Sequence, residues 1–238
     1  MTLRSPEEWA ELLCSNKEST QMAAMRELRQ ASPDQANPVV ILKPFLQGRS
    51  AVAGLASLLD GMAIQMLTAA QTRDEASGAA ELLRQFYPEG ILQGHPDRGI
   101  LLPLQELLAQ QSYQHADALT TQILCRVAGE GAVDRAWLYF TEVRTIPKTV
   151  LAGIDQLWWL FSEGKFSYRV QRQIWLSGGK SWERLWAQIG WKKSGSFTRY
   201  PGGFTWDLTA PRGHLPLTNQ LRGNKVLLEL FSHPLWQD

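Results

Sequence analysis

The chain has 238 residues, of which 44% are hydrophobic and 20% charged, a balance that excludes an intrinsically disordered chain or a coiled-coil rod. The net charge of +1 conceals two unlike halves, because residues 137–238 carry 13 Lys and Arg against 7 Asp and Glu. Nine of the ten tryptophans lie in the same basic segment. We therefore expect a flat anionic ligand to bind in the C-terminal half.

The N-terminal sequence predicts neither export nor a membrane span. Residues 1–10 are already charged and lack the apolar stretch of a signal peptide, and no run of about 18 apolar residues occurs in the chain. Cys14 and Cys125 lie far apart and are expected to be buried in a reducing compartment. These features predict a soluble, cytoplasmic protein. Peripheral membrane contact through an exposed apolar loop is a further hypothesis, without a sequence signal of its own.

Residues 1–90 have the pattern of a small N-terminal helical bundle. Apolar residues recur at helical spacing, while Lys43-Pro44 and Gly48 predict breaks between short helices. The region up to Phe86 contains no histidine and no chemical constellation, which favours a scaffold or docking domain over a catalytic one. After it, the composition shifts to Pro, Gly, Asp and His, which predicts an exposed connector and a domain boundary.

The second predicted domain, residues 98–238, is also helical. Ile154, Leu157, Trp158 and Phe161 have the spacing of one buried helix face. No strand-rich stretch competes, so the predicted fold class is all-α. Tryptophans on the helices are expected to pack in the core; these are Trp158, Trp175, Trp182 and Trp186. Further helices are predicted around Leu101–Leu108, Ala116–Val127, Val170–Ile174 with Ser167 as its cap, and Trp182–Ile189.

Residues 191–224 break the helical pattern, since they hold five glycines and three prolines. Loops of this length are uncommon unless they are functional or disordered, and the apolar content here argues against disorder. We predict an ordered loop that faces a ligand. Phe204 and Trp206 could equally attach the loop to the helices. The aromatic residues of the loop are Trp191, Phe197, Tyr200, Phe204 and Trp206.

The charges of this loop favour the same kind of ligand. A planar acid can stack on aromatic faces while guanidinium groups bind its carboxylates. His214 could act as an axial metal ligand, but no second ligand lies at metal-site spacing, which favours a hydrogen-bonded structural histidine and no metal site. Against the single acid Asp207, the loop has five cations: Lys192, Lys193, Arg199, Arg212 and Arg222.

No motif for catalysis is found. The sequence contains no GxSxG, no HExxH, no glycine-rich phosphate loop and no paired acids in the basic segment, so no catalytic residue is predicted. An enzyme that acts on tetrapyrroles would need an acid–base pair or a metal site assembled by folding from distant residues.

Several segments closely resemble the core domain of the "genomes uncoupled" tetrapyrrole-binding family, over about Leu101 to Trp236. The resemblance implies a helical core shaped like a cupped hand, with long ordered loops that form a porphyrin-binding cleft. It also implies a separate N-terminal helical bundle, as in bacterial members. The segments that carry the resemblance are Ile154–Trp159, Val170–Trp175, Leu185–Lys192, Phe204–Leu217, Asn219–Gly223 and Ser232–Trp236.

The resemblance also implies a function. Proteins of this family bind protoporphyrin IX and magnesium protoporphyrin IX and stimulate magnesium chelatase in chlorophyll biosynthesis. The expected role is therefore that of a non-catalytic accessory, with a porphyrin as ligand and no obligatory cofactor. The expected protein partner is the large porphyrin-binding subunit of the chelatase.

By position, the family's cleft is walled by the long loop and by a second loop, residues 139–147. Tyr200 stands where the family usually has tryptophan, and Lys225 where it usually has arginine, so stacking and bidentate carboxylate binding are expected to be weaker here. The predicted porphyrin-binding residues are Phe140, Val143, Phe197, Arg199, Tyr200, Phe204, Trp206, His214, Leu217, Arg222 and Lys225.

The main alternative is a single-stranded nucleic-acid binding module, because aromatic residues interleaved with Lys and Arg also describe such platforms. The isoelectric point of about 7.8 is modest, and the cations cluster in one loop instead of forming a long stripe. The sequence therefore favours a porphyrin and no nucleic acid as the partner.

Overall fold

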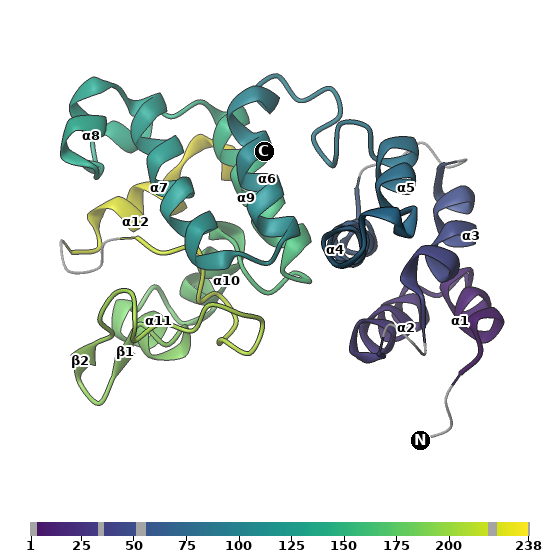
Figure 1. Cartoon of the computed structure of the whole chain (residues 1–238). Helices are drawn as coiled ribbons and strands as arrows, with labels where there is room; N and C mark the ends of the chain where they lie inside the picture. Colours follow the sequence, from purple (N-terminus) through teal and green to yellow (C-terminus); the bar gives the residue numbers. More distant parts are fainter. Residues whose placement is uncertain (1–3, 33–35, 51–55, 219–222, 238) are drawn as a thin grey trace. The chain divides into compact units, whose positions relative to one another are not determined.

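A computed structural model describes residues 4–32, 36–50, 56–218 and 223–237 (Figure 1). The chain divides into two compact units, Met1–Gln93 and Gly94–Asp238, and each is described by itself. Both units are helical, which confirms the predicted all-α class. In the described residues the only strands are the two-residue β1 (Lys192–Lys193) and β2 (Ser196–Phe197), which pair antiparallel.

The first unit is a bundle of short helices around α4. Met62, Ala63 and Leu67 of α4 are fully buried and form the centre of its core. Its helices are α1 (Pro6–Leu13), α2 (Glu18–Gln30), α3 (Pro38–Ser50), α4 (Leu58–Arg73) and α5 (Ala79–Phe86), with the 3₁₀ turn η1 (Glu75–Ser77) before α5.

Two predictions for this unit are wrong. Lys43-Pro44 and Gly48 do not break the chain, because both lie inside α3. A proline in a helix removes one backbone hydrogen bond, and the burial of Phe45 and its apolar neighbours on α3 offsets that loss. Cys14 is exposed, since it follows the last residue of α1; Cys125 is buried as predicted.

The second unit is built around α9. Ile154, Leu157, Trp158 and Phe161 are fully buried on this helix, which confirms the predicted helix face. Figure 1 shows α6 beside α7 and α9, and it packs on both. The elements are α6 (Arg98–Ala109), α7 (Tyr113–Ala128), α8 (Glu130–Arg135), the 3₁₀ turn η2 (Glu142–Thr145), α9 (Lys148–Phe161), α10 (Tyr168–Ser177), α11 (Trp182–Gln188), α12 (Lys225–Ser232) and the 3₁₀ turn η4 (Pro234–Trp236).

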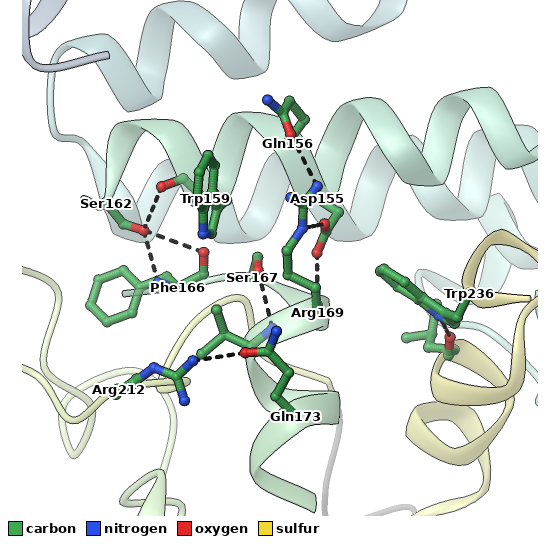
Figure 2. Close-up of polar contacts among 12 residues, drawn as sticks. Asp155, Gln156, Trp159, Ser162, Phe166, Ser167, Arg169, Gln173, Arg212 and Trp236 are labelled. Carbon is green, nitrogen blue, oxygen red and sulfur yellow. Dashed lines mark hydrogen bonds and ion pairs between the residues drawn. The ribbon is translucent and has the colours of Figure 1, made fainter. Parts of the chain in front are cut away.

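Polar contacts fix the turn between α9 and α10 (Figure 2). The buried Asp155 carboxylate accepts the Arg169 backbone N–H at 2.8 Å and forms an ion pair with the Arg169 guanidinium. Ser167 caps α10, as predicted, by accepting the Val170 N–H. A helix pair held in this way provides a rigid support for the loops that follow it.

The helical tryptophans form two groups. Trp158 is fully buried and donates through Nε1 to Thr120 Oγ1 at 2.9 Å, as expected of a core residue. Trp175 is also buried, but Trp182 and Trp186 are only half-buried. We call the second group the tryptophan row: Trp175, Trp182 and Trp186, with Phe231 and Phe197 beside them at ring distances of 5.1–6.1 Å.

No helix in the described part of the chain combines the length and the apolar character needed to cross a membrane.

Candidate functional site

The long loop between α11 and α12 is held by buried anchors. Trp191 is fully buried, and its Nε1–H donates to the His214 carbonyl at 2.8 Å, so it joins the start of the loop to a point 23 residues later. Near that point, the Gly213 N–H donates to the Lys165 carbonyl at 2.9 Å. Gly213 has φ +82°, and a Cβ there would come within 2.8 Å of Ile174. The described part of the loop, through Thr218, is therefore ordered by specific contacts.

His214 acts as the central support of this loop. Its Nδ1 lies 2.6 Å from the Ile189 carbonyl, and its Nε2 accepts the Thr205 N–H at 3.2 Å, so Nδ1 carries the proton. Burial lowers the pKa of this imidazole below its usual value, which favours the neutral ring. With both nitrogens occupied, His214 has the hydrogen-bonded structural role that its lone position in the sequence favours.

Four rings of the long loop pack together, and we call them the loop aromatic cluster: Tyr200, Phe204, Trp206 and His214. Phe204 packs on His214 at 5.4 Å and on Trp206 at 6.1 Å, while Tyr200 meets Trp206 edge-on at 5.8 Å. Their exposure differs: Phe204 is buried, Trp206 is half-buried, and Tyr200 is 56% exposed. Phe204 thus attaches the loop to the core, whereas Tyr200 exposes its ring on the surface.

A second loop, residues 136–147 between α8 and α9, carries Phe140 and Val143. The Glu142 carboxylate accepts Arg135 Nη2 at 2.6 Å and the Tyr139 N–H at 2.7 Å, which fixes the start of this loop. Val143 is fully buried, so its side chain is covered in this structure. Phe140 is half-buried and lies under the Lys225 ammonium at 5.1 Å.

The remaining predicted site residues lie in different surroundings. Phe197 packs on Trp186 at 5.1 Å and so belongs to the tryptophan row. Arg199 is exposed, and Leu217 is buried with its N–H 2.6 Å from Asp117 Oδ1. Arg222 lies outside the described residues.

Six of the eleven predicted residues therefore form two groups. Tyr200, Phe204, Trp206 and His214 make one, and Phe140 with Lys225 makes the other. Within the described ranges, no ring contact, hydrogen bond or ion pair joins them. The arrangement offers exposed aromatic surface with nearby cations, which suits a flat, apolar ligand that carries carboxylates.

One polar residue at this site was missed by sequence reasoning. Asp117 on α7 is 4% exposed, and burial raises its pKa to about 7. A signal was available in the sequence: Asp117 lies four residues after Tyr113 and three before Thr120, both on the buried face of the same helix. A carboxylate at such a position is uncommon unless it is paired or functional.

The described residues contain no group of three or more His, Cys, Asp or Glu placed to hold a metal ion. The two loops supply aromatic faces and cations, and α7 adds the buried carboxyl group of Asp117.

Fold and site together define an all-helical domain with a long, aromatic and basic loop. Residues 98–234 match the family model described as GUN4-like, and the chain belongs to this family. The match confirms the resemblance inferred from the sequence.

Relatives and solved structures agree with this assignment. A Ycf53-like protein of Synechocystis is 52% identical over 155 residues, which cover 65% of this chain and 66% of that protein. The chloroplastic tetrapyrrole-binding protein of Arabidopsis thaliana is 39% identical, over 55% of this chain and 53% of that protein. GUN4 from Chlamydomonas reinhardtii is structurally similar with a TM-score of 0.54 and 36% identity, covering 58% of this chain and 88% of that one. Ligand-free GUN4 of Arabidopsis thaliana is structurally similar with a TM-score of 0.53 and 40% identity, covering 58% of this chain and 94% of that one.

Proposed function

We propose that the chain binds protoporphyrin IX and magnesium protoporphyrin IX and stimulates magnesium chelatase as a non-catalytic accessory. The observation that carries the porphyrin part is the GUN4-like match over residues 98–234, together with a relative named as a tetrapyrrole-binding protein. The two loops described above lie within the matched residues and supply the aromatic and cationic surface that such a ligand needs.

In the proposed complex, the face of the macrocycle lies on Phe140 and Tyr200, while Lys225, Arg199 and Arg222 bind its carboxylates. At about 25 cal/mol per Å², a macrocycle that buries a few hundred Å² gains several kcal/mol before ordering costs, which corresponds to roughly micromolar binding. The Lys225 ammonium lies over the Phe140 ring, so a macrocycle on this face of the ring displaces it. The freed ammonium is then available to a carboxylate.

Titration of the full chain with deuteroporphyrin, followed by quenching of tryptophan fluorescence, tests porphyrin binding. Phe140→Ala should raise the Kd roughly tenfold, because a half-buried aromatic face worth about 1.4 kcal/mol is lost. Tyr139→Ala is the matched control: Tyr139 is exposed in the same loop, it is not a predicted contact, and its backbone bond to Glu142 is kept. Equal Kd values for the two variants would remove Phe140 from the site.

The same titration separates the porphyrin carrier from a nucleic-acid module. Binding driven by apolar burial should change little with salt, whereas binding to single-stranded DNA should weaken steeply. Salt-sensitive DNA binding without porphyrin binding would overturn the proposal.

The proposed partner is the large porphyrin-binding subunit of magnesium chelatase. If stimulation depends on porphyrin binding, Phe140→Ala should stimulate the chelatase less than the natural protein, in proportion to its weaker porphyrin binding. Tyr139→Ala should bind porphyrin and stimulate the chelatase as the natural protein does. Stimulation by Phe140→Ala at the unaltered level would separate the two activities. We also propose that the protein acts in the cytoplasm and can associate peripherally with a membrane.

We also propose that residues 1–90 form an N-terminal bundle domain, separate from a core domain at residues 98–238, and that the bundle serves as a scaffold or docking module. The division of the chain into units at Gln93 and Gly94 supports this organisation.

A further inference from the structure

Asp117 links the long loop to the helical core. It lies on the buried face of α7, and its Oδ1 accepts the Leu217 N–H at 2.6 Å, which joins residues 100 positions apart. Leu217 is the last buried residue of the described part of the loop. The carboxyl group is therefore next to the backbone of a predicted porphyrin contact.

The charge of this carboxyl group acts on the hydroxyls of two tyrosines. Tyr168, at the start of α10, is fully buried and its hydroxyl has no hydrogen-bond partner in the structure. Tyr200 belongs to the loop aromatic cluster; burial raises the pKa of its hydroxyl, and the charge of Asp117 adds to this rise. The same charge, with that of Asp155, acts on Tyr168. The charge of Asp117 thus acts on the tyrosine that is proposed to meet the ligand, and its oxygen holds the loop at Leu217.

No cation neutralises Asp117 within the described ranges. Asp155 is the other acid that acts on Tyr168, and it is paired with Arg169. The hydrogen bond from Leu217 lowers the pKa of Asp117, but burial raises it more, to about 7. Among the described residues, other charged or titratable groups on α7 and on the elements packed against it form no ion pair or hydrogen bond with Asp117; these are Arg98, Glu106, His115, Arg126, Glu130, Asp134, Arg135, Glu142 and Arg144.

We propose that Asp117 is a specificity-determining residue of the cleft, which takes up a proton from solvent when an anionic ligand binds against Tyr200 and Leu217. This inference rests on the proposed porphyrin binding. The proton is transferred to the carboxylate of Asp117, and no bond of the ligand changes. The cleft then selects among ligands by their net charge.

The direction of the effect follows from linkage. A nearby anion stabilises the protonated carboxyl, so the pKa of Asp117 is higher in the complex than in the free protein. Affinity is therefore greatest below the pKa of the free protein and falls as the pH rises through it. A rise of about one pKa unit on binding corresponds to a tenfold change in Kd across this range. His214 titrates at lower pH because its pKa is lowered, and Tyr200 at higher pH because its pKa is raised.

Calorimetric titration of the full chain with deuteroporphyrin, in phosphate and in Tris at about pH 7.5, measures the proton uptake. The natural protein should take up a fraction of a proton, and its Kd should rise up to about tenfold between about pH 6 and pH 9. Asp117→Asn keeps an oxygen acceptor for Leu217 N–H but should show neither effect. Asp134→Asn, the same charge change at an exposed position on α8, should behave as the natural protein.

A ligand with more carboxylates sharpens the test. Coproporphyrin has four carboxylates and deuteroporphyrin two, so Asp117→Asn should improve the Kd for coproporphyrin several-fold more than that for deuteroporphyrin. The pH profile of the natural protein needs no variant, and a flat profile would overturn the inference even if Asp117→Asn failed to fold. Porphyrin binding with equal proton uptake by the natural protein and Asp117→Asn would overturn the inference and leave the proposed function standing. No porphyrin binding at all would overturn both.

Discussion

Trp191→Ala should lower the free energy of unfolding of the C-terminal unit by about 3–5 kcal/mol. The Trp191 side chain is fully buried, so its removal loses apolar burial and leaves a cavity. It also removes the hydrogen bond to the His214 carbonyl, which becomes a buried acceptor without a partner. Urea unfolding followed by circular dichroism measures the change.

The loss should extend to ligand binding, because His214 supports Thr205 and packs on Phe204. Trp191→Phe is the matched variant: it keeps most of the apolar volume and should lose only about 1–3 kcal/mol, mainly from the unpaired carbonyl. If the free energy of unfolding of Trp191→Ala lay within about 1 kcal/mol of that of the natural protein, Trp191 would not anchor the loop.

Asp117→Asn should raise the free energy of unfolding by about 2–4 kcal/mol at about pH 8, a rare gain from a buried substitution. The pKa of Asp117 is about 7 in the folded protein, against about 3.9 for an exposed aspartate. Between these values the unfolded chain is ionised while the folded protein holds the proton, so stability falls as the pH rises from about 4 to about 7 and is then constant. Each unit of the difference corresponds to about 1.4 kcal/mol, which sets the upper limit near 4 kcal/mol.

Unfolding measured at several pH values separates this effect from a packing change. The advantage of Asp117→Asn should vanish below about pH 4, where the natural carboxyl is protonated in both states. Asp134→Asn should stay within about 0.5 kcal/mol of the natural protein at every pH, because its side chain is exposed. A stability difference for Asp117→Asn that did not change with pH would contradict the raised pKa.

Local patterns in the sequence were sufficient to predict the fold class. The helix around Ile154–Phe161 and the Ser167 cap follow from apolar spacing and a side-chain oxygen at a helix start, both of which act over a few residues. Pro44 shows the limit of such rules, since tertiary burial of α3 outweighs the local cost of a proline.

The candidate site was less accessible to sequence reasoning. Aromatic and basic residues of the long loop are visible in the sequence, but which ring faces inward depends on contacts between distant segments. Phe204 is buried and packs on His214, whereas Tyr200 is exposed and meets the edge of Trp206. Asp117 is connected to the loop by its hydrogen bond from Leu217, which lies 100 residues away in the sequence. The assignment of these residues to a porphyrin cleft stays a prediction.

Whether a porphyrin binds against the two loops is tested most directly by nuclear magnetic resonance of the full, ¹⁵N-labelled chain. Adding deuteroporphyrin should cause large ring-current shifts in the amides around Phe140 and in Tyr200–Leu217, and in the indole N–H of Trp206. The indole N–H groups of the tryptophan row should change little. Large shifts confined to Trp182 and Trp186, or to the first unit, would contradict the proposed site and place the ligand elsewhere.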